Sequence, residues 1–349
     1  MEIGAFTFAD VPTGDGAEPA RRIPELLEEI ALADEVGLDV FGLGEHHRAG
    51  FGAPAPAVLL AAAAARTTRI RLTSAVTVLG SDDPVRVFEQ FTALDLVSRG
   101  RAEIMAGRGA LLDSFRLFGY DLHDYDALFD EKLRLLLALR EPGPVTWSGR
   151  FRPPLHQELV LPRPVQERIP VWIGVGGSRN SVVRAASLGL PLAVGTIGGT
   201  AEHFAPMVEL YHEALEHYGR PSQPVAVTVH GFVADTSQAA ADVYFPADAA
   251  LFSSLGAERG LPPVTAADAA AKNGPGSMYA VGSPGQVVEK LLHQYDVLGH
   301  QRVMLQLALG PVPHREIMRA IELLGTEVAP TVRAEAARSR ANEQGATRA

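Results

Sequence analysis

The sequence predicts an α/β protein folded as a (β/α)₈ barrel, and three observations lead to this prediction. Short apolar runs alternate with amphipathic stretches along most of the 349 residues. Eight strand–helix pairs are found, the number that closes such a barrel, for which about 250 residues are typical. The surplus length falls into two insertions, roughly Pro142–Arg168 before the fifth strand and Asp235–Val281 after the seventh. An open doubly wound sheet normally shows a dinucleotide fingerprint after its first strand, and none is present there.

The first four strand–helix pairs fall before residue 140. The strands are expected at Ile3–Phe8, Val40–Gly44, Ile70–Val78 and Ala102–Ala106. The helices are expected around Ile23–Ala31, across Val58–Arg66, from Pro84 to about Ser98, and over Leu128–Leu139. In the first helix the apolar residues recur at i, i+3, i+4 and i+7, which marks one helical face. Gly37 suits the left-handed end of that helix.

The pattern resumes after the first insertion, whose prolines indicate an extended excursion or a hairpin. The later strands are expected at Val171–Val175, Leu192–Gly195, Val225–Val233 and Val303–Leu307. The later helices are expected at Val182–Leu188 with Gly189 after it, at Phe204–Tyr218, from Ser283 onward, and up to Gly325. Ser283 and Gln286 have the spacing of a capping box, with proline at the first helical position. We expect one domain over residues 1–333 and a flexible tail over 334–349.

The composition excludes several classes of function. The formal net charge of −10 offers no basic field to a nucleic-acid backbone or an anionic membrane surface. The chain has no cysteine, which removes disulfides and thiolate metal sites. The opening MEIGAFTFAD lacks the basic region of a signal peptide, and the longest apolar run, near Ala55–Ala65, is too short for a membrane span. We therefore expect a cytoplasmic protein.

In a (β/α)₈ barrel the active site forms at the C-terminal ends of the strands. After the second strand come Glu45, His46 and His47. Because histidine titrates near neutral pH, His46 with Glu45 beside it is a candidate general acid or base, and His47 is a candidate substrate contact. The alternative is that these histidines cap a helix or lie on the surface. A metal site is disfavoured, since neighbouring residues of an extended segment point to opposite sides.

A second candidate site follows the fifth strand, where Gly176, Gly177 and Ser178 lead into a helix that contains Ser181. Glycines let the backbone approach a ligand closely, and a helix N-terminus favours an anion. The alternative is a tight turn in which Ser178 is simply the N-cap. The loop matches neither the dinucleotide fingerprint nor the P-loop.

Arg108 stands between two glycines after the fourth strand. Its planar guanidinium suits a phosphate, and the alternative is an ion pair with a barrel loop. Together with the loop at 176–181, Arg108 predicts a phosphate monoester held from two sides. The third strand ends near the small residues Ser74 and Ala75, which leave room for a flat ring against the backbone.

Two further polar residues lie in apolar strands. They are His230 in the seventh strand and Gln306 in the eighth. Buried polar side chains need partners, so each either forms a hydrogen bond inside the barrel or contacts the substrate. The second insertion, Asp235–Val281, is a candidate lid near the mouth of the barrel.

A series of short motifs runs through the chain in a specific order. The series is Glu45-His46-His47, Asp83-Pro84-Val85-Arg86, Ser98-Arg99-Gly100-Arg101, Gly107-Arg108-Gly109, Phe115–Tyr120, Asp124-Tyr125-Asp126, Trp147-Ser148-Gly149-Arg150, Gly176-Gly177-Ser178 and Gly282-Ser283-Pro284. In order and spacing it resembles the bacterial-luciferase-like flavin monooxygenases, over roughly residues 1 to 330. Single motifs are only moderately specific, whereas the ordered set is very specific.

The resemblance implies a (β/α)₈ barrel that uses FMN in reduced form, with O₂, to oxygenate a small organic substrate such as a carbonyl compound. His46 matches the family's essential histidine, and Arg108 matches its phosphate-binding arginine. Its phosphate loop matches Gly177, Ser178 and Ser181. The resemblance also implies a non-proline cis peptide under the flavin ring, at Ser74–Ala75 or Ala75–Val76. In this family a separate reductase often supplies the reduced flavin, and homodimers are common.

One position departs from the family pattern. Luciferase itself carries a cysteine just before the phosphate-binding arginine, and the residue here is Gly107, so we expect no light emission. The family also contains deazaflavin-dependent oxidoreductases, which transfer hydride without oxygen, and proteins that bind flavin without known turnover. Both classes remain alternatives to the FMN-dependent monooxygenase that the sequence favours.

Overall fold

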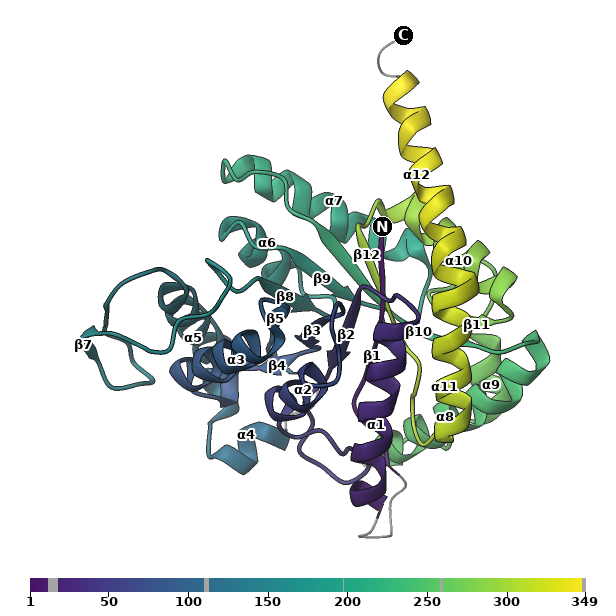
Figure 1. Ribbon diagram of the computed structural model, residues 1–349, viewed down its shortest axis with the longest axis horizontal. Helices are drawn as coiled ribbons and strands as arrows, with labels where there is room; N and C mark the ends of the chain where they lie inside the picture. Colours follow the sequence, from purple (N-terminus) through teal and green to yellow (C-terminus); the bar gives the residue numbers. More distant parts are fainter. Residues whose placement is uncertain (12–17, 110–112, 197, 258–259, 347–349) are drawn as a thin grey trace.

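Parallel strands occupy the centre of the protein and helices surround them (Figure 1). The computed structural model describes residues 1–11, 18–109, 113–196, 198–257 and 260–346. Within these residues the central ring comprises β1 (Glu2–Thr7), β2 (Val40–Leu43), β3 (Arg71–Ser74), β5 (Ala102–Gly107), β8 (Val171–Val175), β9 (Leu192–Gly195), β10 (Val225–Val233) and β12 (Arg302–Gln306). Each strand pairs in parallel with its neighbours, and β9 pairs with β10 to close the ring. The predicted (β/α)₈ barrel is confirmed.

A helix follows each barrel strand, and these helices cover the outside of the barrel. They are α1 (Glu18–Glu35), α2 (Pro56–Ala64), α3 (Pro84–Ser98), α5 (Tyr125–Arg140), α6 (Arg179–Ser187), α7 (Ala201–His217), α10 (Pro284–Leu298) and α11 (His314–Leu323). Their ends follow the sequence signals. Gly37 and Gly189 have φ of 82° and 65° after α1 and α6, and Ser283 with Gln286 forms the predicted capping box at α10.

Both insertions contain secondary structure. The first contains the antiparallel hairpin of β6 (Val145–Trp147) and β7 (Leu155–Glu158), one of the two forms that its prolines indicate. The second contains α8 (Ser237–Ala257), α9 (Ala266–Ala271) and β11 (Ala280–Gly282), which pairs with the end of β10. The sequence does not predict β11, because three residues are too few to show a period. Shorter elements are η1 (Leu79–Ser81), α4 (Asp113–Phe118), η2 (Leu122–Asp124) and η3 (Leu324–Val328).

The predicted third strand, Ile70–Val78, is interrupted. β3 ends at Ser74, and β4 (Thr77–Val78) pairs separately with the end of β5. A cis peptide bond joins Ala75 to Val76, at the second of the two positions that the resemblance implies. The β-branched pattern runs through this break, so hydrophobic period alone cannot reveal it.

The tail expected over residues 334–349 is helical up to Ala346. α12 (Ala329–Ala346) follows η3 and extends away from the barrel (Figure 1). Two of its arginines bind the rest of the protein: Arg333 Nη2 donates to the Gly37 carbonyl and to Asp39 Oδ2, and Arg340 Nε donates to the Tyr295 hydroxyl. Residues 347–349 of the predicted tail lie outside the described residues.

Apolar side chains fill two regions. The larger core lies between the strands and the helices that cover them. A smaller cluster occupies the barrel interior and consists of Phe6, Val40, Ala75, Met105, Trp172, Ala193, Ala226 and Met304. Burial on both faces explains why the barrel strands have nearly continuous apolar runs. None of the described helices is both long enough and apolar enough to span a membrane.

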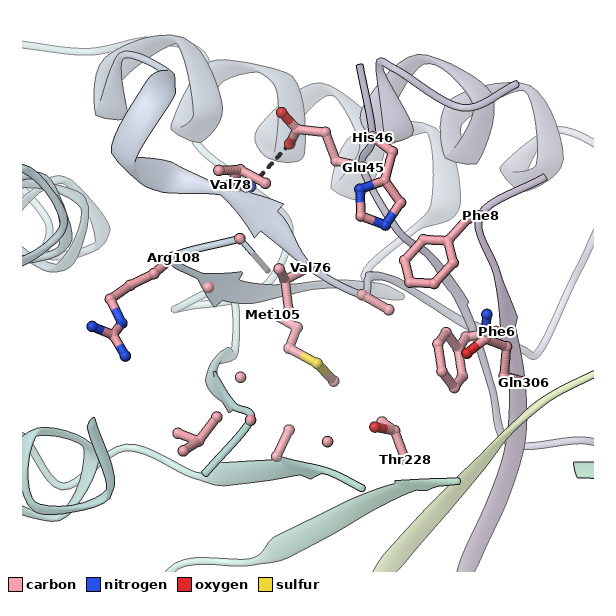
Figure 2. Close-up of a pocket in the computed structure, with 18 of the residues that line it drawn as sticks. Phe6, Phe8, Glu45, His46, Val76, Val78, Met105, Arg108, Thr228 and Gln306 are labelled. Carbon is pink, nitrogen blue, oxygen red and sulfur yellow. Dashed lines mark hydrogen bonds between the residues drawn. The ribbon is translucent and has the colours of Figure 1, made fainter. Parts of the chain in front are cut away.

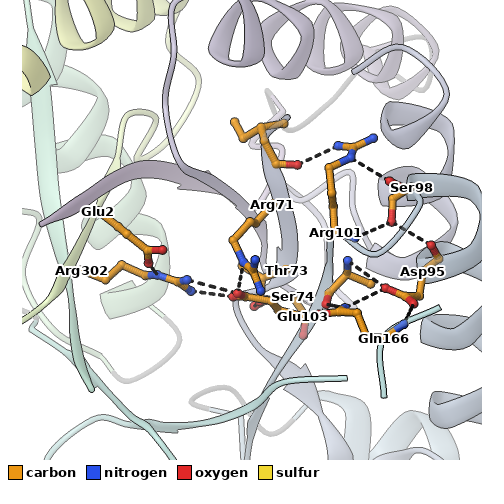
Figure 3. Close-up of polar contacts among 12 residues, drawn as sticks. Glu2, Arg71, Thr73, Ser74, Asp95, Ser98, Arg101, Glu103, Gln166 and Arg302 are labelled. Carbon is orange, nitrogen blue, oxygen red and sulfur yellow. Dashed lines mark hydrogen bonds and ion pairs between the residues drawn. The ribbon is translucent and has the colours of Figure 1, made fainter. Parts of the chain in front are cut away.

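A buried ion-pair network occupies the N-terminal end of the barrel (Figure 3). The Arg302 guanidinium donates to both carboxylate oxygens of Glu103, at 2.6 and 3.1 Å, and to Glu2 at 2.6 Å. Arg71 also donates to Glu103, and the Arg302 guanidinium lies 4.4 Å from the centroid of the Trp172 ring. The side chains of Arg302 and Glu103 are each 2% exposed. Their charges are therefore compensated within the protein and not by solvent.

Substitution Glu103→Gln should destabilise the fold strongly, because it leaves the buried Arg302 guanidinium with only the half-exposed Glu2 as a counter-charge. Breaking one partner of a buried ion pair typically lowers the free energy of unfolding by about 3–5 kcal/mol. Urea unfolding followed by circular dichroism measures this loss. The control Arg86→Gln breaks an exposed pair with Glu89 and should cost at most about 1 kcal/mol. Equal losses in the two variants would contradict the interpretation.

The same pair predicts a pH dependence. Burial raises the pKa of Glu103, but Arg302 and Arg71 outweigh it and hold that pKa below its ordinary value. The contribution to stability is therefore complete above the unfolded-state pKa of about 4.3 and is lost as pH falls through the lower folded-state pKa. Acid unfolding curves should accordingly be steeper for the wild type than for Glu103→Gln below about pH 4.5. Parallel curves would argue against this linkage.

Candidate functional site

A cavity of about 520 Å³ lies at the C-terminal mouth of the barrel (Figure 2). Its volume is in the range of about 300–1,000 Å³ that is usual for cofactor and small-molecule sites. The sequence-predicted residues that line it are Glu45, His46, Ala75, Arg108, Gly176, Ser178, Ser181, His230 and Gln306. Of the remaining predicted residues, Ser74, Gly177 and His47 do not line it. Closure of the barrel thus brings together residues that are more than 250 positions apart in the chain.

Val76 forms an apolar floor in the cavity, and two glycines make room for it. A Cβ at Gly107 would stand 2.5 Å from Val76 Cγ2, and a Cβ at Gly174 would stand 2.6 Å from Val76 Cγ1. A side chain at either position would displace Val76. Met105 and Ala75 also line the cavity, and Figure 2 shows Val76 and Met105 projecting into the same space. This floor suits the flat face of an aromatic ring.

The loop before α6 forms a polar end of the cavity. Ser178 is the N-cap of α6, and its hydroxyl accepts from the Ser181 amide at 3.4 Å. The Ser181 hydroxyl is buried and has no hydrogen-bond partner among the described residues. A Cβ at Gly176 would project into open space, and Gly177 has φ of 122°, so its role is in the turn. The loop is therefore both the N-cap turn and an open cradle for an anion.

Arg108 lies at the same mouth and pairs with a replaceable partner. Its Nη1 donates to Asp126 Oδ1, and its guanidinium lies 5.0 Å from the centroid of the Tyr125 ring. The Tyr125 hydroxyl in turn donates to the Gly109 carbonyl at 2.7 Å. Because the Asp126 side chain is 69% exposed, its pairing with Arg108 is solvent-screened and contributes little. The expected ion pair with a loop is present, and it leaves Arg108 available to a phosphate.

His46 lies between two aromatic rings. The centroid of its imidazole is 4.4 Å from that of Phe8 and 4.5 Å from that of Phe51. Gly44 makes this possible, because a Cβ there would stand 2.0 Å from the Phe8 ring. Burial, followed by the charges of Arg48 and His47, lowers the pKa of His46 to about 4. The expectation that it titrates near neutral pH is therefore wrong for this structure, and the imidazole is neutral at pH 7.

Glu45 connects two segments of the barrel mouth. Its Oε2 accepts from the Val78 amide at 2.9 Å, and its Oε1 lies 2.7 Å from His47 Nε2. Both carboxylate oxygens are therefore in use, which favours a positioning role over direct proton transfer. His47 faces a separate pocket of about 210 Å³ behind Glu45, where its ring meets Phe118. The described residues include no group of three or more His, Asp or Glu side chains that could hold a metal ion.

Ser74 has a structural environment and does not reach the cavity. Its hydroxyl donates to the Met105 carbonyl and accepts from the Met105 amide, both at 3.1 Å. The backbone register between β3 and β5 extends only over Leu72 and Thr73. The side chain of Ser74 thus continues the connection between these strands where their backbone pairing stops. The expected cofactor contact of Ser74 is corrected accordingly.

Several cavity residues are absent from the sequence prediction. They are Phe6, Phe8, Phe51, Met105, Tyr125, Thr228 and, from α8, Leu251, Phe252 and Leu255. A signal exists for Phe8, because it lies at the C-terminal end of the first predicted strand. No local signal exists for the α8 residues, since an apolar helical face does not show what it packs against.

Comparison with known proteins identifies the family. A family model described as luciferase-like monooxygenase matches residues 1–302. The chain belongs to this family. A luciferase-like monooxygenase of Escherichia coli strain K12 is 30% identical over 249 residues, which cover 69% of this chain and 70% of that protein. The resemblance inferred from the ordered motifs is thereby confirmed.

Solved structures of similar fold cover almost the whole chain. The monooxygenase RslO1 from Streptomyces bottropensis superposes with a TM-score of 0.80 at 25% identity, covering 95% of this chain and 99% of its own. The oxygenating constituent of 3,6-diketocamphane monooxygenase from Pseudomonas putida, solved with FMN, gives 0.77 at 21% identity and coverages of 95% and 98%. An F420-dependent secondary alcohol dehydrogenase gives 0.74 at 17% identity, with the same coverages. The last two likenesses concern the fold alone.

The environment of His46 in this luciferase-like monooxygenase generates a prediction. Proton NMR should show that the His46 imidazole resonance, like that of the buried His230, has a titration midpoint near pH 4, because burial disfavours the imidazolium. Loss of this resonance in His46→Gln assigns it. A His46 resonance with a midpoint between pH 6 and 7 would show that the imidazole is solvated and that the aromatic enclosure is absent.

Proposed function

We propose that this protein is an FMN-dependent monooxygenase that uses reduced FMN and O₂ to oxygenate a small organic substrate of carbonyl type. One observation carries the proposal: a single cavity combines an anion-binding end, an apolar floor and an enclosed histidine. Reduced FMN, when bound, supplies the activation of O₂. The protein supplies binding, orientation and exclusion of water.

The anion-binding end fits the phosphate of FMN. The buried Ser181 hydroxyl lacks a partner among the described residues, and a phosphate oxygen would satisfy it. The N-terminus of α6 favours negative charge, and Arg108 can exchange the exposed Asp126 for a phosphate. The flavin ring would lie on Val76, in the space that Gly107 and Gly174 leave free.

The wall around His46 fits a proton-transfer role. Its imidazole is neutral at pH 7 and lines the cavity between Phe8 and Phe51. A neutral imidazole accepts a proton from a reacting group and returns it later, without holding it in the resting enzyme. The two aromatic rings limit access of water to that proton. Glu45, held by the Val78 amide, fixes the backbone segment that carries His46.

A deazaflavin is the second candidate cofactor, with hydride transfer as its reaction. Its long acidic tail would need several cations at the mouth, and Arg108 is the one Arg or Lys that lines the cavity within the described residues. FMN is therefore favoured.

The proposal also includes a separate reductase that supplies reduced flavin, and a homodimer, both on the basis of the family. Direct competition between FMN and F420 for the apoprotein distinguishes the cofactors, and a panel of carbonyl substrates that increases O₂ consumption distinguishes an enzyme from a flavin carrier.

Substitution Arg108→Gln should weaken FMN binding by about tenfold to a hundredfold, because it removes a charge-assisted hydrogen bond to the phosphate. Binding of riboflavin, which has no phosphate, should change less than about threefold. Fluorescence quenching of each flavin measures both dissociation constants. The control Arg86→Gln removes an exposed arginine on α3 and should affect neither. Equal weakening of FMN and riboflavin would place the phosphate elsewhere.

Substitution His46→Gln should leave FMN affinity unchanged while lowering substrate turnover about 100-fold or more, as loss of a proton-transfer group does. Product formation from a carbonyl substrate, with reduced FMN supplied chemically, measures the rate. Unchanged turnover would remove His46 from the reaction. A parallel loss of FMN affinity would instead assign it to cofactor binding.

A further inference from the structure

Two polar side chains lie next to each other in an otherwise apolar part of the cavity. His230 on β10 and Gln306 on β12 are partners in the parallel register, which places their Cα atoms about 5 Å apart. Phe6 on β1 is the next partner in the same row. All three residues line the cavity, and His230 and Gln306 are 6% and 2% exposed. Adjacent strands thus present an imidazole and an amide side by side.

Neither side chain is fully satisfied by the protein. His230 Nδ1 and Gln306 Nε2 are buried and have no hydrogen-bond partner among the described residues. Tyr279, whose ring centroid lies 5.0 Å from that of His230, has its hydroxyl already in use, because it donates to Asp248 Oδ1 at 3.1 Å. Buried polar groups are paired in most native structures. This pair therefore points to a ligand that supplies the missing hydrogen bonds.

The surroundings of the pair are apolar and carry no net charge. One face of α8 contributes Leu251, Phe252 and Leu255 to the cavity wall. Burial, with a smaller effect of Lys272, lowers the pKa of His230 to about 4, so the imidazole is neutral. Arg108 lies on the opposite side of the pocket from Gln306 (Figure 2). Lys272, whose Nζ lies 4.6 Å from the centroid of the Phe252 ring, is already paired with Asp248 at 3.7 Å. An anion near Gln306 would therefore be buried without a free counter-charge, which is costly.

We propose that His230 and Gln306 bind the oxygen atom of a neutral carbonyl substrate, and that the α8 wall holds its hydrocarbon part. The inference rests on the proposed function, because it needs the flavin ring between Arg108 and this wall. A site built to hydrogen-bond an oxygen discriminates strongly against an analogue that lacks it, since its own polar groups are then left unpaired. Neutral ketones and aldehydes are accordingly selected over both hydrocarbons and carboxylates.

Calorimetric titration of the FMN-loaded protein tests this selection. The probes are cyclohexanone and heptanal, the hydrocarbon analogues methylenecyclohexane and 1-octene, and the anion cyclohexanecarboxylate. The wild type should bind at least one carbonyl probe about tenfold or more tightly than its hydrocarbon analogue. In His230→Phe and Gln306→Met, which keep the side-chain volume nearly constant, this preference should fall below about threefold. FMN affinity should be unchanged in both, and His203→Phe, on the exposed side of α7, is the matched control.

The outcomes separate this inference from the proposed function. Failure of the wild type to bind FMN would overturn both. If FMN binds normally, four results would overturn the inference and leave the proposed function standing. These are that no carbonyl probe binds, that the wild type shows no preference for carbonyl probes, that this preference survives in both variants, or that the carboxylate binds more tightly than the carbonyl probes. A preference that falls in His230→Phe and Gln306→Met but not in His203→Phe supports it.

Discussion

Hydrogen bonds between β9 and β10 close the ring of strands, and the position of every candidate functional residue depends on that closure. In a closed parallel barrel each strand has a partner on both sides, so no edge remains exposed. Closure also brings the C-terminal ends of all strands to one mouth. His46, Arg108, Ser178 and Gln306 therefore line one cavity although they come from four different βα units.

The two ends of the barrel differ in how their polar groups are satisfied. At the N-terminal end, Arg302 and Glu103 satisfy each other with a bidentate pair, and Glu2 and Arg71 complete the charge balance. At the C-terminal mouth, by contrast, a buried serine hydroxyl, an imidazole nitrogen and an amide nitrogen lack protein partners within the described residues. Buried polar groups commonly lack hydrogen-bond partners within the protein at functional sites and have such partners elsewhere. His300, just before β12 at the N-terminal end, also has two ring nitrogens that are unpartnered in the described part of the chain, but it does not line the cavity, whereas the three groups at the mouth all line it.

Shape at the mouth comes from residues that are small or apolar rather than charged. Gly107 and Gly174 leave space for the Val76 side chain, and Gly44 leaves space for the Phe8 ring. These three glycines therefore determine where the floor and one wall of the cavity lie. Another part of the wall comes from α8, in the second insertion. Because the insertion lies outside the βα repeat, its sequence is free to differ without disturbing the barrel. Substrate choice can thus depend on a segment that the fold itself does not require.

The sequence by itself determined the barrel, the approximate positions of its strands, the helix caps and the order of motifs that identifies the family, because these signals are local or repeat with a fixed period. Only the tertiary structure decided which side chains face the cavity. Ser74 and Ser181 look alike in the sequence, yet Met105 satisfies one hydroxyl and nothing described satisfies the other. The neutral state of His46 likewise depends on Phe8 and Phe51, which only folding brings together. Burial and hydrogen-bond partners depend on contacts between segments that are far apart in the sequence, and no local sequence pattern specifies them.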